Sequence, residues 1–394
     1  MSKWRKITIG DLGKIVTGKT PSTKNENFWN GDIPFVTPSD LQKSKHVFFT
    51  ERTVSQEGLT AVRGQVLSSG AICVSCIGNL GYTAMTTQVS VSNQQINSII
   101  PSDDFDKNFI YYLMKSLWDE FKNLEGQSTT LSILNKTLFS KMEVIVPEVN
   151  TQKQIAKVLS SLDDKIELNT QINHNLEEQI RVLFEDFFIN SQHCANWKQG
   201  TIADLGNVVG GSTPSKAKPE YYTSNGIAWI TPKDLSGTKS KFISKGESDI
   251  TPAGLRNSSA VIMPRGTVLF SSRAPIGYIA IAKNEITTNQ GFKSVVPHLH
   301  IGTAFVYCFL KHNLPKMESM ASGSTFKEVS GSVMKAIPAV IPAKEVLMNF
   351  STITQPLFDQ QELLESENQR LTRLRDAMLP KLMSGEIDVS EVEI

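Results

Sequence analysis

Cysteine is scarce in this sequence, and long apolar runs are missing. Four cysteines among 394 residues are too few for a disulfide-framed scaffold and favour a reducing, cytoplasmic setting. No apolar stretch is long enough to span a bilayer, and no apolar run near the first residue resembles a signal peptide. With 40% hydrophobic and 20% charged residues, the composition predicts a soluble globular protein with two domains, each burying its own core.

Motifs that carry catalysis are equally scarce. The six histidines form no His-Glu-x-x-His metal motif, and no Gly-x-Ser-x-Gly turn stands at a strand end. Cys73 and Cys76 have the spacing of half a zinc or redox site, but zinc would need two further ligands. We therefore expect both cysteines to lie in a half-buried strand, and we expect no metal ligands in the chain.

One segment does satisfy a catalytic pattern. Gly13–Thr20 matches the P-loop G-x-x-x-x-G-K-[ST], in which backbone N–H groups and the start of a following helix hold phosphate. Here Pro21 and several polar residues follow, which is a poor helix start, and a second similar segment has Ser212 in place of the lysine. We interpret the segment as a structural or phosphate-contacting loop and expect no nucleotide hydrolysis.

What the sequence has in abundance is repetition. Gly10–Ser22 and Ile33–Leu41 reappear as Ala203–Ser215 and Ile227–Leu235, at offsets of 193 and 194 residues. The match continues at an offset of 196 through these segments: Gly81-Tyr82 with Gly277-Tyr278, and Asn93-Gln94 with Asn289-Gln290. A period this long indicates two copies of one domain rather than a solenoid. The function therefore calls for two similar surfaces.

The net charge of +1 hides an asymmetry along the chain. Residues 1–150 carry 15 basic and 14 acidic side chains, and residues 191–342 carry 16 and 8. Residues 151–190 carry 4 basic and 7 acidic side chains, and residues 343–394 carry 5 and 10. The second repeat is thus clearly basic, while the segment after each repeat is acidic. This pattern indicates a polyanion on one surface and protein partners on another.

Each repeat begins with short β-favouring runs separated by turn residues, which predicts a mostly β core. The expected strands are Ile33–Val36, Gln65–Leu67, Ala71–Val74, Ile227–Ile230, Val268–Phe270 and Ile279–Ala282, with Val144–Val146 and Ala339–Ile341 at the two ends. Phe109–Leu117 and Ala304–Leu310 are predicted to be helices that cover one side of each repeat.

After each repeat the apolar period changes to 3.5 residues. Eight of ten seam positions from Ile155 to Phe187 are apolar, and so are eight of ten from Val346 to Met378. Asn169 and Gln360 occupy equivalent polar places in the two seams. A seam sustained over four heptads predicts a coiled coil, and buried polar seam residues fix its register. The alternative is a long helix packed on a globular core.

We therefore predict an α+β protein with two similar, mostly β domains joined and separated by two long antiparallel helices, with pseudo-two-fold symmetry. A helix from Ile155 to Phe187 is about 50 Å long, and duplex DNA repeats every 34–36 Å. Two domains held by such helices could read two half-sites roughly one turn apart. The expected bounds are 1–148 and 191–342 for the domains, and 149–190 and 343–394 for the helical segments.

The chain resembles the specificity subunit of type I restriction–modification systems, in which two target-recognition domains are each followed by a long helix. The resemblance covers nearly the whole chain, in the right order, and it depends on the set of motifs rather than on any one. The matching segments are Gly18–Ser22, Gly211–Ser215, Thr37–Leu41, Thr231–Leu235, Asn93-Gln94, Asn289-Gln290 and the ending Leu379–Ile387.

This resemblance implies a DNA-binding scaffold without catalysis of its own. Each domain would read half of a split double-stranded DNA target. The helices would bind two adenine-N6 methyltransferase subunits and, through them, the restriction and translocase subunits. S-adenosylmethionine, ATP and Mg would belong to those partners, and no membrane is expected. The sequence agrees, because it has no Asn-Pro-Pro-Phe or Asp-Pro-Pro-Tyr motif and no glycine-rich S-adenosylmethionine loop.

Base reading needs side chains that bond groove edges, with Lys and Arg on phosphates. In the first repeat the candidates are Thr20, Ser22, Lys24, Lys43, Lys45, Arg63, Gln127 and Ser128, with Thr129 beside them. In the second repeat they are Thr213, Ser215, Lys216, Lys218, Lys233, Lys239, Lys241, Arg256, Arg273 and Ser324. Arg273 stands where the first repeat has Ile77, a difference that two unlike half-sites would require. The Asn-Gln pairs either bond DNA or tie down a turn.

Other functions stay open on the sequence alone. The chain could serve a methylation-only system that lacks a restriction subunit. It could be a self-contained P-loop NTPase or nuclease, which ATP turnover or DNA cleavage by the purified chain would reveal. It could also be a coiled-coil adaptor, which predicts no sequence-selective DNA binding when the methyltransferase is present.

Overall fold

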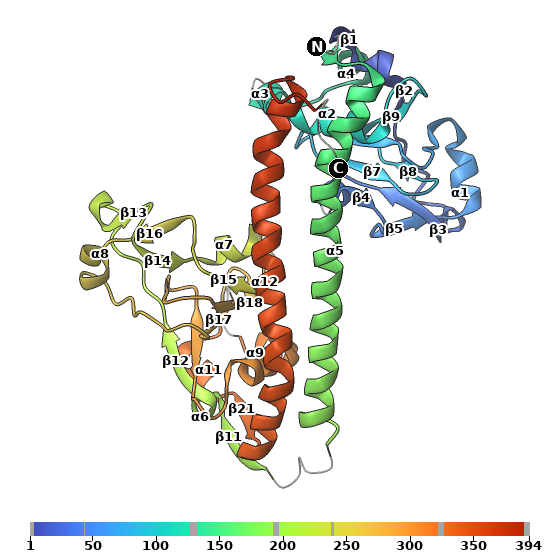
Figure 1. The fold of residues 1–394 in the computed structure, drawn as a ribbon. Coiled ribbons are helices and arrows are strands. Elements are labelled where there is room, and N and C mark those ends of the chain that lie inside the picture. The colour runs from blue at the N-terminus through green and yellow to red at the C-terminus, as the bar shows by residue number, and fades with distance from the viewer. Residues whose placement is uncertain are drawn as a thin grey trace. The chain divides into compact units, whose positions relative to one another are not determined.

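A computed structural model of the chain describes residues 4–42, 44–126, 132–191, 197–237, 240–321 and 327–389. The chain forms two compact units: unit 1 is Met1–Leu168 with Asn368–Ile394, and unit 2 is Asn169–Glu367. Each unit holds one repeat and a segment of each of two long helices, α5 (Val149–Phe188) and α12 (Lys344–Met383). These helices are green and red in Figure 1. The domain bounds expected from the sequence stay predictions.

The main sheet of unit 1 has five strands in the order β2-β9-β6-β7-β4. Their bounds are β2 Gly13–Thr17, β4 His46–Val47, β6 Ile72–Ser75, β7 Thr83–Thr86 and β9 Ile96–Pro101. All pairs are antiparallel except β4 with β7. Side chains of β6 alternate between two buried clusters, with Ile72 and Val74 in one and Cys73 in the other. Both faces of this sheet are therefore covered.

A smaller sheet of unit 1 has the order β5-β3-β8, with β3 Trp29–Val36, β5 Arg52–Val54 and β8 Val91–Ser92. Strand β3 is antiparallel to β5 and parallel to β8. A separate pair joins β1 (Arg5–Thr8) near the start of the repeat to β10 (Glu143–Val146) at its end. This pairing closes the repeat just before α5 begins.

Unit 2 repeats this topology, except that two strands, β13 and β14, stand where unit 1 has the single strand β3. Its main sheet has the order β12-β20-β17-β18-β15, with β12 Gly206–Gly210, β15 Phe242–Ile243, β17 Val268–Ser272, β18 Ile276–Ala282 and β20 Lys293–Pro297. Its smaller sheet has the order β13-β16-β14-β19, with β13 Tyr222–Thr223, β14 Ile227–Ile230, β16 Ser248–Ile250 and β19 Thr287–Thr288. Strands β11 (Lys198–Thr201) and β21 (Pro338–Ile341) form the closing pair. The predicted duplication is confirmed.

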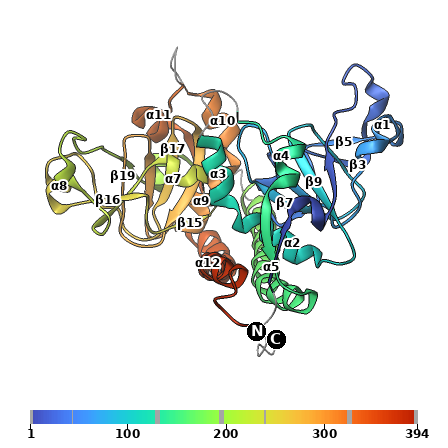
Figure 2. The same ribbon diagram turned by 90° about the horizontal axis from the view of Figure 1, so that it is seen from above.

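One buried helix in each repeat lies against the main sheet. Helix α2 (Lys107–Ser116) begins where the Asp106 carboxylate accepts a hydrogen bond from the Phe109 N–H at 2.9 Å. It contacts β6 and β7 and lies between the sheet and α5 (Figure 2). Helix α9 (Thr303–His312) is its counterpart against β17, β18 and β20. Both predicted covering helices are confirmed.

The remaining helices are short and lie in the connections. In unit 1 they are α1 Gln56–Ala61, α3 Trp118–Gly126 and α4 Lys136–Lys141. In unit 2 they are α6 Ile202–Leu205, α7 Pro232–Gly237, α8 Pro252–Arg256, α10 Leu314–Ser319 and α11 Gly331–Ala336. No helix in the described parts of the chain combines the length and apolarity that crossing a membrane requires.

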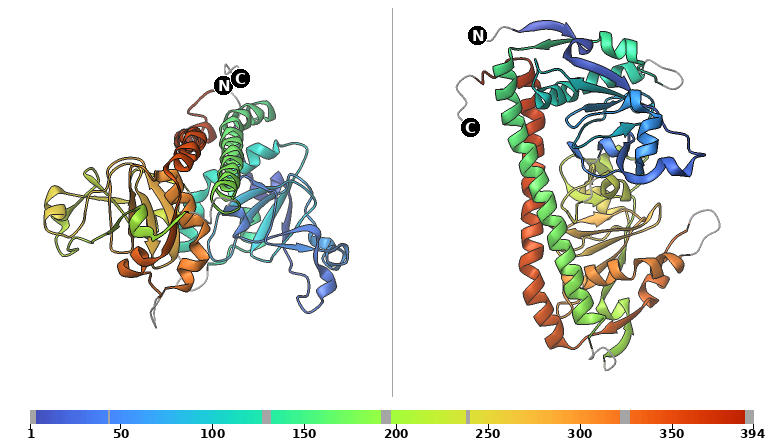
Figure 3. Two further views of the ribbon diagram at one scale, coloured as in Figure 1. Left: turned by 90° about the horizontal axis from the view of Figure 1, so that it is seen from below. Right: turned by 90° about the vertical axis from the view of Figure 1, so that its right-hand side faces the viewer.

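The long helices contribute to the core of each unit. In unit 1, Leu159 of α5 and Leu382 of α12 are fully buried in one cluster with Phe109 of α2. The right-hand view of Figure 3 shows the beginning of α5 and the end of α12 side by side next to the sheets of this unit. In unit 2, Phe184 of α5 and Phe350 of α12 share a cluster with helix α9. Each repeat is therefore packed on a helix pair, not on a single helix.

Hydrogen bonds between the helices give their direction. In unit 1 the Asn368 side chain donates to the carbonyl of Ile166 at 3.3 Å. In unit 2 Asn169 donates to the Glu367 carboxylate at 2.8 Å, and Gln361 donates to the Asn173 carbonyl at 3.1 Å. Later residues of α5 thus meet earlier residues of α12. The predicted antiparallel pairing is confirmed.

The predicted seam is correct for α5 and partly wrong for α12. Its α5 positions are buried or half-buried throughout, including Asn169. On α12, however, Ile353, Gln360 and Leu374 are exposed, and the buried residue near the middle is Gln361, 3% exposed. Both helices also pack against the repeats, which widens their buried stripes beyond a coiled-coil seam. On α12 the buried positions therefore do not keep a strict 3.5-residue period.

Most predicted strands are confirmed, although β3 begins four residues before the predicted Ile33 and β18 begins three residues before the predicted Ile279. The exception is Gln65–Leu67, where Gln65 ends a short 3-10 turn and Leu67 makes only an isolated bridge to Ser90. Leu67 is buried and Val66 is half-buried without forming a ladder, a pattern that periodicity alone could not distinguish from a strand.

Candidate nucleic-acid interface

The glycine–threonine motif and the Asn-Gln pair, far apart in the sequence, meet in both units. In unit 1 the Thr20 hydroxyl donates to the side-chain oxygen of Gln94 at 2.8 Å. In unit 2 the Thr213 hydroxyl makes the same hydrogen bond to Gln290. The repeated motifs are therefore parts of one local structure, built twice.

Close backbone approach explains why both motifs contain a glycine. A Cβ atom on Gly18 would lie 2.1 Å from the carbonyl oxygen of Asn93, and one on Gly211 would lie 2.0 Å from that of Asn289. Neither position has room for any side chain. No helix follows Lys19, since the segment after Gly18 is irregular up to a 3-10 turn at Glu26–Phe28. The expected departure from P-loop geometry is thus confirmed.

Parallel strand pairs bring a third motif to the same place. Strands β3 and β8 are parallel, so their carboxyl ends lie at one edge of the small sheet, where the Asn93 N–H donates to the Val36 carbonyl at 3.1 Å. In unit 2, β14 and β19 are parallel, and Asn289 donates to Ile230 at 2.9 Å. We call this place the loop edge. It comprises Gly18–Ser22, Thr37–Ser39 and Asn93-Gln94 in unit 1, and Gly211–Ser215, Thr231–Lys233 and Asn289-Gln290 in unit 2.

Several conspicuous motif residues hold the loop edge together. The Asp40 carboxylate accepts from the N–H and hydroxyl of Thr37 at 3.0 and 2.8 Å, and Asp234 accepts from Thr231 at 2.7 and 2.6 Å. The Asn93 side-chain oxygen accepts from the N–H of Gln95 at 3.1 Å, forming a local turn. The Thr-Pro-x-Asp and Asn residues therefore tie down the local backbone, as one of the two readings of the asparagine expects, and DNA contact by the Asn-Gln pairs stays a prediction.

Buried or half-buried aromatic rings fix the backbone of the exposed loops. The Trp29 indole N–H donates to the Ser22 carbonyl at 3.2 Å, and that of Trp229 donates to the Ser212 carbonyl at 3.0 Å. In unit 2 the Tyr222 hydroxyl also donates to the Pro214 carbonyl at 2.6 Å. The backbone of loops held in this way needs little further ordering on binding.

Many predicted contact residues lie on or beside the loop edge, and their side chains are accessible. Thr20 and Thr213 are half-buried, and the exposed ones are Ser22, Lys24, Ser215, Lys216 and Lys218. The Lys218 ammonium lies 5.3 Å from the centre of the Tyr221 ring, and hydrogen bonding to Tyr221 raises the pKa of Lys218. These residues stay predictions as DNA contacts.

Two predicted phosphate contacts are corrected by the structure. Lys45 is 8% exposed and Lys241 is 7% exposed. The Lys45 ammonium donates to the Ser160 hydroxyl of α5 at 2.9 Å, and the Lys241 ammonium donates to Glu177 of α5 at 2.9 Å. A buried ammonium committed to a helix cannot reach a phosphate, so both lysines belong to the interior of their units.

The other predicted residues are spread more widely. Arg63 and Arg256 are exposed, on a 3-10 turn and at the end of α8. Lys233 is exposed and pairs with Glu247 at 2.7 Å, a hydrogen bond that raises the lysine pKa. Arg273 is half-buried, 3.5 Å from the Glu328 carboxylate. Five predicted residues lie outside the described part of the chain, and so does Thr129: Lys43, Gln127, Ser128, Lys239 and Ser324.

Sequence reasoning missed one residue beside the loop edge. The Arg52 guanidinium lies 3.7 Å from the centre of the Trp29 ring, and the side chain is exposed. Its position follows from the pairing of Arg52 with Phe35 in the small sheet. The sequence contains no signal for this register, so the arginine could not be distinguished from any other surface cation.

The described residues offer no place for a metal ion. No group of three or more His, Cys, Asp or Glu side chains lies close enough together in the described ranges to hold one. Burial raises the pKa of the Cys73 thiol to about 11 and that of Cys76 to about 12. Both thiols are fully covered, so they are poor metal ligands and poor nucleophiles at neutral pH. The two cysteines are buried more deeply than the half-buried strand that was expected.

Comparison with known proteins supports one family. The chain is 27% identical, over 99% of its length and 94% of the relative's, to the specificity subunit of the type I restriction enzyme MjaIX of Methanocaldococcus jannaschii. It is 22% identical, over 98% and 100%, to the HindI specificity subunit of Haemophilus influenzae. The crystal structure of a type I S subunit from M. genitalium matches with a TM-score of 0.57 and 18% identity, covering 97% of this chain and 96% of that one, and so shares the fold.

Specificity subunits are the non-catalytic components that recognise DNA targets, which agrees with the lack of catalytic motifs in the sequence. The family model described as the type I restriction modification DNA specificity domain matches residues 1–178 and again residues 195–373. These two matches cover most of the chain, and each contains one copy of the loop edge. The chain therefore belongs to the family of type I restriction modification DNA specificity domains and carries two of them.

Proposed function

We propose that this chain reads a bipartite DNA target, one half-site with each repeat, and that its long helices bind partner subunits. The observation that supports this most is the duplicated loop edge. The same three segments meet in both units, on the same strands and with the same Thr-to-Gln hydrogen bond. A surface kept in both copies, on a scaffold of shared helices, suits a target with two parts.

Differences between the two copies give them different half-sites. The second repeat carries an excess of 8 basic side chains, whereas the first carries 1. Lys216 and Lys218 follow the unit 2 motif directly, where unit 1 has Thr23 and Asn25. Lysines on phosphates supply affinity, and the neighbouring polar side chains supply base preference.

Exposed apolar side chains on the long helices support the proposal of protein partners. Leu363 is 65% exposed and Met348 is 56% exposed, and others of the same kind are Leu168, Val182, Ile353 and Leu374. Exposed apolar side chains along both long helices can be covered by a partner protein. We propose that two adenine-N6 methyltransferase subunits bind there and carry the restriction subunits.

Catalytic groups would reside in those partners. S-adenosylmethionine, ATP and Mg are proposed to bind to the methyltransferase and restriction subunits, and none to this chain. The proposal includes a cytoplasmic location, because Cys73, Cys76 and Cys308 are free thiols and chromosomal DNA is the target.

The central test is a map of N6-methyladenine in the host genome, with the gene intact and with it deleted. We expect one methylated motif to disappear on deletion, and we expect it to consist of two short half-sites separated by an unspecified spacer. Complementation with the intact gene should restore it. An unchanged map, or the loss of a continuous motif, would contradict the proposal.

A methylation-only system is the second candidate. A restriction assay in the same host distinguishes it from a complete restriction–modification system. Unmodified phage or plasmid DNA carrying the mapped motif should be restricted if a restriction subunit takes part. Equal survival of modified and unmodified DNA would show that the chain serves methylation alone.

Lys216→Ala tests the proposed phosphate contact in unit 2. We expect weaker binding of the methyltransferase complex to all DNA sequences, and a slope of log affinity against log salt that is flatter by about 1, because one counterion fewer is released. Fluorescence anisotropy at several salt concentrations gives this slope. Lys335→Ala, at an exposed site on α11, is the control and should leave it unchanged. A slope equal to that of the wild type in Lys216→Ala would remove this lysine from the interface.

A further inference from the structure

The two buried lysines occupy equivalent positions in the repeats. Lys45 directly precedes β4, and its carbonyl accepts a hydrogen bond from the Met85 N–H at 2.8 Å. Lys241 directly precedes β15, and its carbonyl accepts from the Ile281 N–H at 2.7 Å. Each lysine therefore lies beside the edge strand of its main sheet, and its side chain extends to α5. A feature kept in both copies calls for a reason other than core packing.

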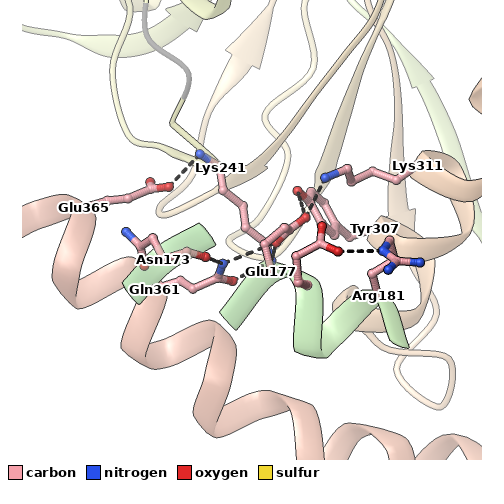
Figure 4. Close-up of polar contacts among 9 residues, drawn as sticks. Asn173, Glu177, Arg181, Lys241, Tyr307, Lys311, Gln361 and Glu365 are labelled. Atoms are coloured by element: carbon pink, nitrogen blue, oxygen red, sulfur yellow. Dashed lines mark hydrogen bonds and ion pairs between the residues drawn. The ribbon is translucent and has the colours of Figure 1, made fainter. Parts of the chain in front are cut away.

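In unit 2 the lysine connects the repeat to both long helices. Its ammonium donates to Glu177 of α5 at 2.9 Å and to the side-chain oxygen of Gln361 of α12 at 2.7 Å. It also lies 3.5 Å from the centre of the Phe358 ring. Figure 4 shows Lys241 directed from the sheet toward Glu177 and Gln361. One side chain thus fixes three elements to one another.

Further charged hydrogen bonds surround this contact. The Glu177 carboxylate also accepts from the Lys311 ammonium at 2.6 Å and from the Tyr307 hydroxyl at 3.0 Å, both on α9. Glu365 of α12 accepts from the backbone N–H of Lys241 at 2.8 Å. Burial opposes ionisation of Glu177, but Lys241 and Lys311 outweigh it and lower the pKa of this carboxyl to about 2. The carboxylate is therefore charged wherever the protein works.

In unit 1 the same connection uses different partners. The Lys45 ammonium donates to Ser160 of α5 and lies 5.2 Å from the centre of the Tyr112 ring. The Tyr112 hydroxyl donates to Asp163 of α5 at 2.6 Å, and Arg375 of α12 donates to the same carboxylate at 2.6 Å. Here too a buried lysine, a tyrosine of the covering helix and a carboxylate of α5 join the repeat to the helix pair.

Such a connection resists sliding in a way that an apolar contact does not. Apolar side chains keep most of their contact when one surface turns by a few degrees. A buried ammonium that loses its polar partner, the Glu177 carboxylate for Lys241 or the Ser160 hydroxyl for Lys45, becomes an unpaired buried charge, which is far more costly. The repeat is therefore held at one angle on its helix pair.

We propose that Lys241, and Lys45 in the other repeat, are positioning residues that fix the angle of each recognition domain on the helices and so restrict the spacer length between half-sites. This inference rests on the proposed bipartite function. One extra base pair turns a half-site by about 35° around the duplex axis. A fixed domain cannot follow that turn, so the DNA must be twisted, at a cost that disfavours the altered spacer. A loosened domain follows it.

The test uses the complete methyltransferase complex and the half-sites identified in the genome. A plasmid library places these half-sites at the natural spacer and at spacers one and two base pairs shorter or longer. Methylation of each spacer is counted by sequencing after expression of the wild type, Lys241→Met or the exposed control Lys335→Met. Methionine keeps the unbranched stem against Phe358, and Glu177 keeps its bonds to Lys311 and Tyr307, so the unit retains most of its contacts.

We expect Lys241→Met to raise methylation at the altered spacers, relative to the natural one, by about tenfold, the factor that corresponds to about 1.4 kcal/mol. Lys335→Met should keep the wild-type profile. A uniform fall at every spacer would show that the lysine is merely structural, and an unchanged profile would also overturn the proposal. Should Lys241→Met fail to fold, Lys45→Met decides in its place by the same criteria. Plasmids that carry one half-site alone complete the library. If the wild-type complex methylated them, the proposed bipartite function itself would fail, which is a distinct result.

Discussion

Gly211→Ala is expected to abolish recognition by the second repeat while the helices stay assembled. The added Cβ would lie 2.0 Å from the carbonyl oxygen of Asn289 and 2.4 Å from that of Thr288. Both atoms are backbone, so no side-chain rotation relieves the overlap, and the motif must separate from the Asn-Gln turn. The Thr213–Gln290 hydrogen bond is lost with it. Overpacking of this kind costs about 1–3 kcal/mol or more. This loss of stability is confined to the loop edge.

Methylation in the host measures recognition by the second repeat, and size-exclusion chromatography of the purified complex measures whether the helices stay assembled. We expect loss of methylation at the bipartite motif, with the complex still eluting at its full size. Gly237→Ala is the matched control, because a Cβ there has no atom within 4 Å. Gly18→Ala and Gly64→Ala form the same pair in unit 1, with 2.1 Å to Asn93 against open space. Normal methylation in Gly211→Ala would show that the loop edge does not read DNA.

Much of this architecture was predictable from the sequence because the chain contains its own alignment. Matching Gly18 with Gly211 and Asn93 with Asn289 identified the segments that meet at the loop edge, without showing that they meet. The contact itself depends on the parallel pairing of β3 with β8, which places Phe35 opposite Val91, 56 residues later in the chain. No local pattern encodes that pairing, so its consequences, including the stacking of Arg52 on Trp29, were not foreseen.

The buried lysines show where reasoning from charge fails. A lysine beside a DNA-binding motif suggests a phosphate contact, and that inference was wrong for Lys45 and Lys241. The sequence did contain a contrary signal, since the helical segments are acidic, but the burial of Glu177 that calls for a cation is visible only in the structure. No local sequence pattern predicts which of several lysines will pair with the acidic helices. The seam of α12 was also misplaced at Gln360. A heptad pattern does not show which neighbouring residues a repeat will cover, and here the repeat covers Gln361.

Glu177→Gln is expected to destabilise unit 2 by about 3 kcal/mol at neutral pH, within the range for a broken buried ion pair. The change leaves the Lys241 ammonium, 7% exposed, without its charged partner, and it weakens the bond from Lys311. Urea unfolding followed by circular dichroism gives the loss. The control is Glu178→Gln, the next residue, whose side chain is 48% exposed in its pair with Arg181. That surface pair should contribute less than about 1 kcal/mol.

Acid should remove the difference between Glu177→Gln and the wild type. The pKa of Glu177 is lowered to about 2 from an ordinary value of 4.5, so the folded state holds this proton more weakly than the unfolded state. The stabilisation is therefore complete above pH 4.5 and is lost as the pH falls from there toward 2. The variant lacks this titration, so the two unfolding curves should converge over that interval, while Glu178→Gln follows the wild type. A constant gap between wild type and Glu177→Gln down to pH 3 would mean that the carboxylate does not stabilise unit 2 through its charge.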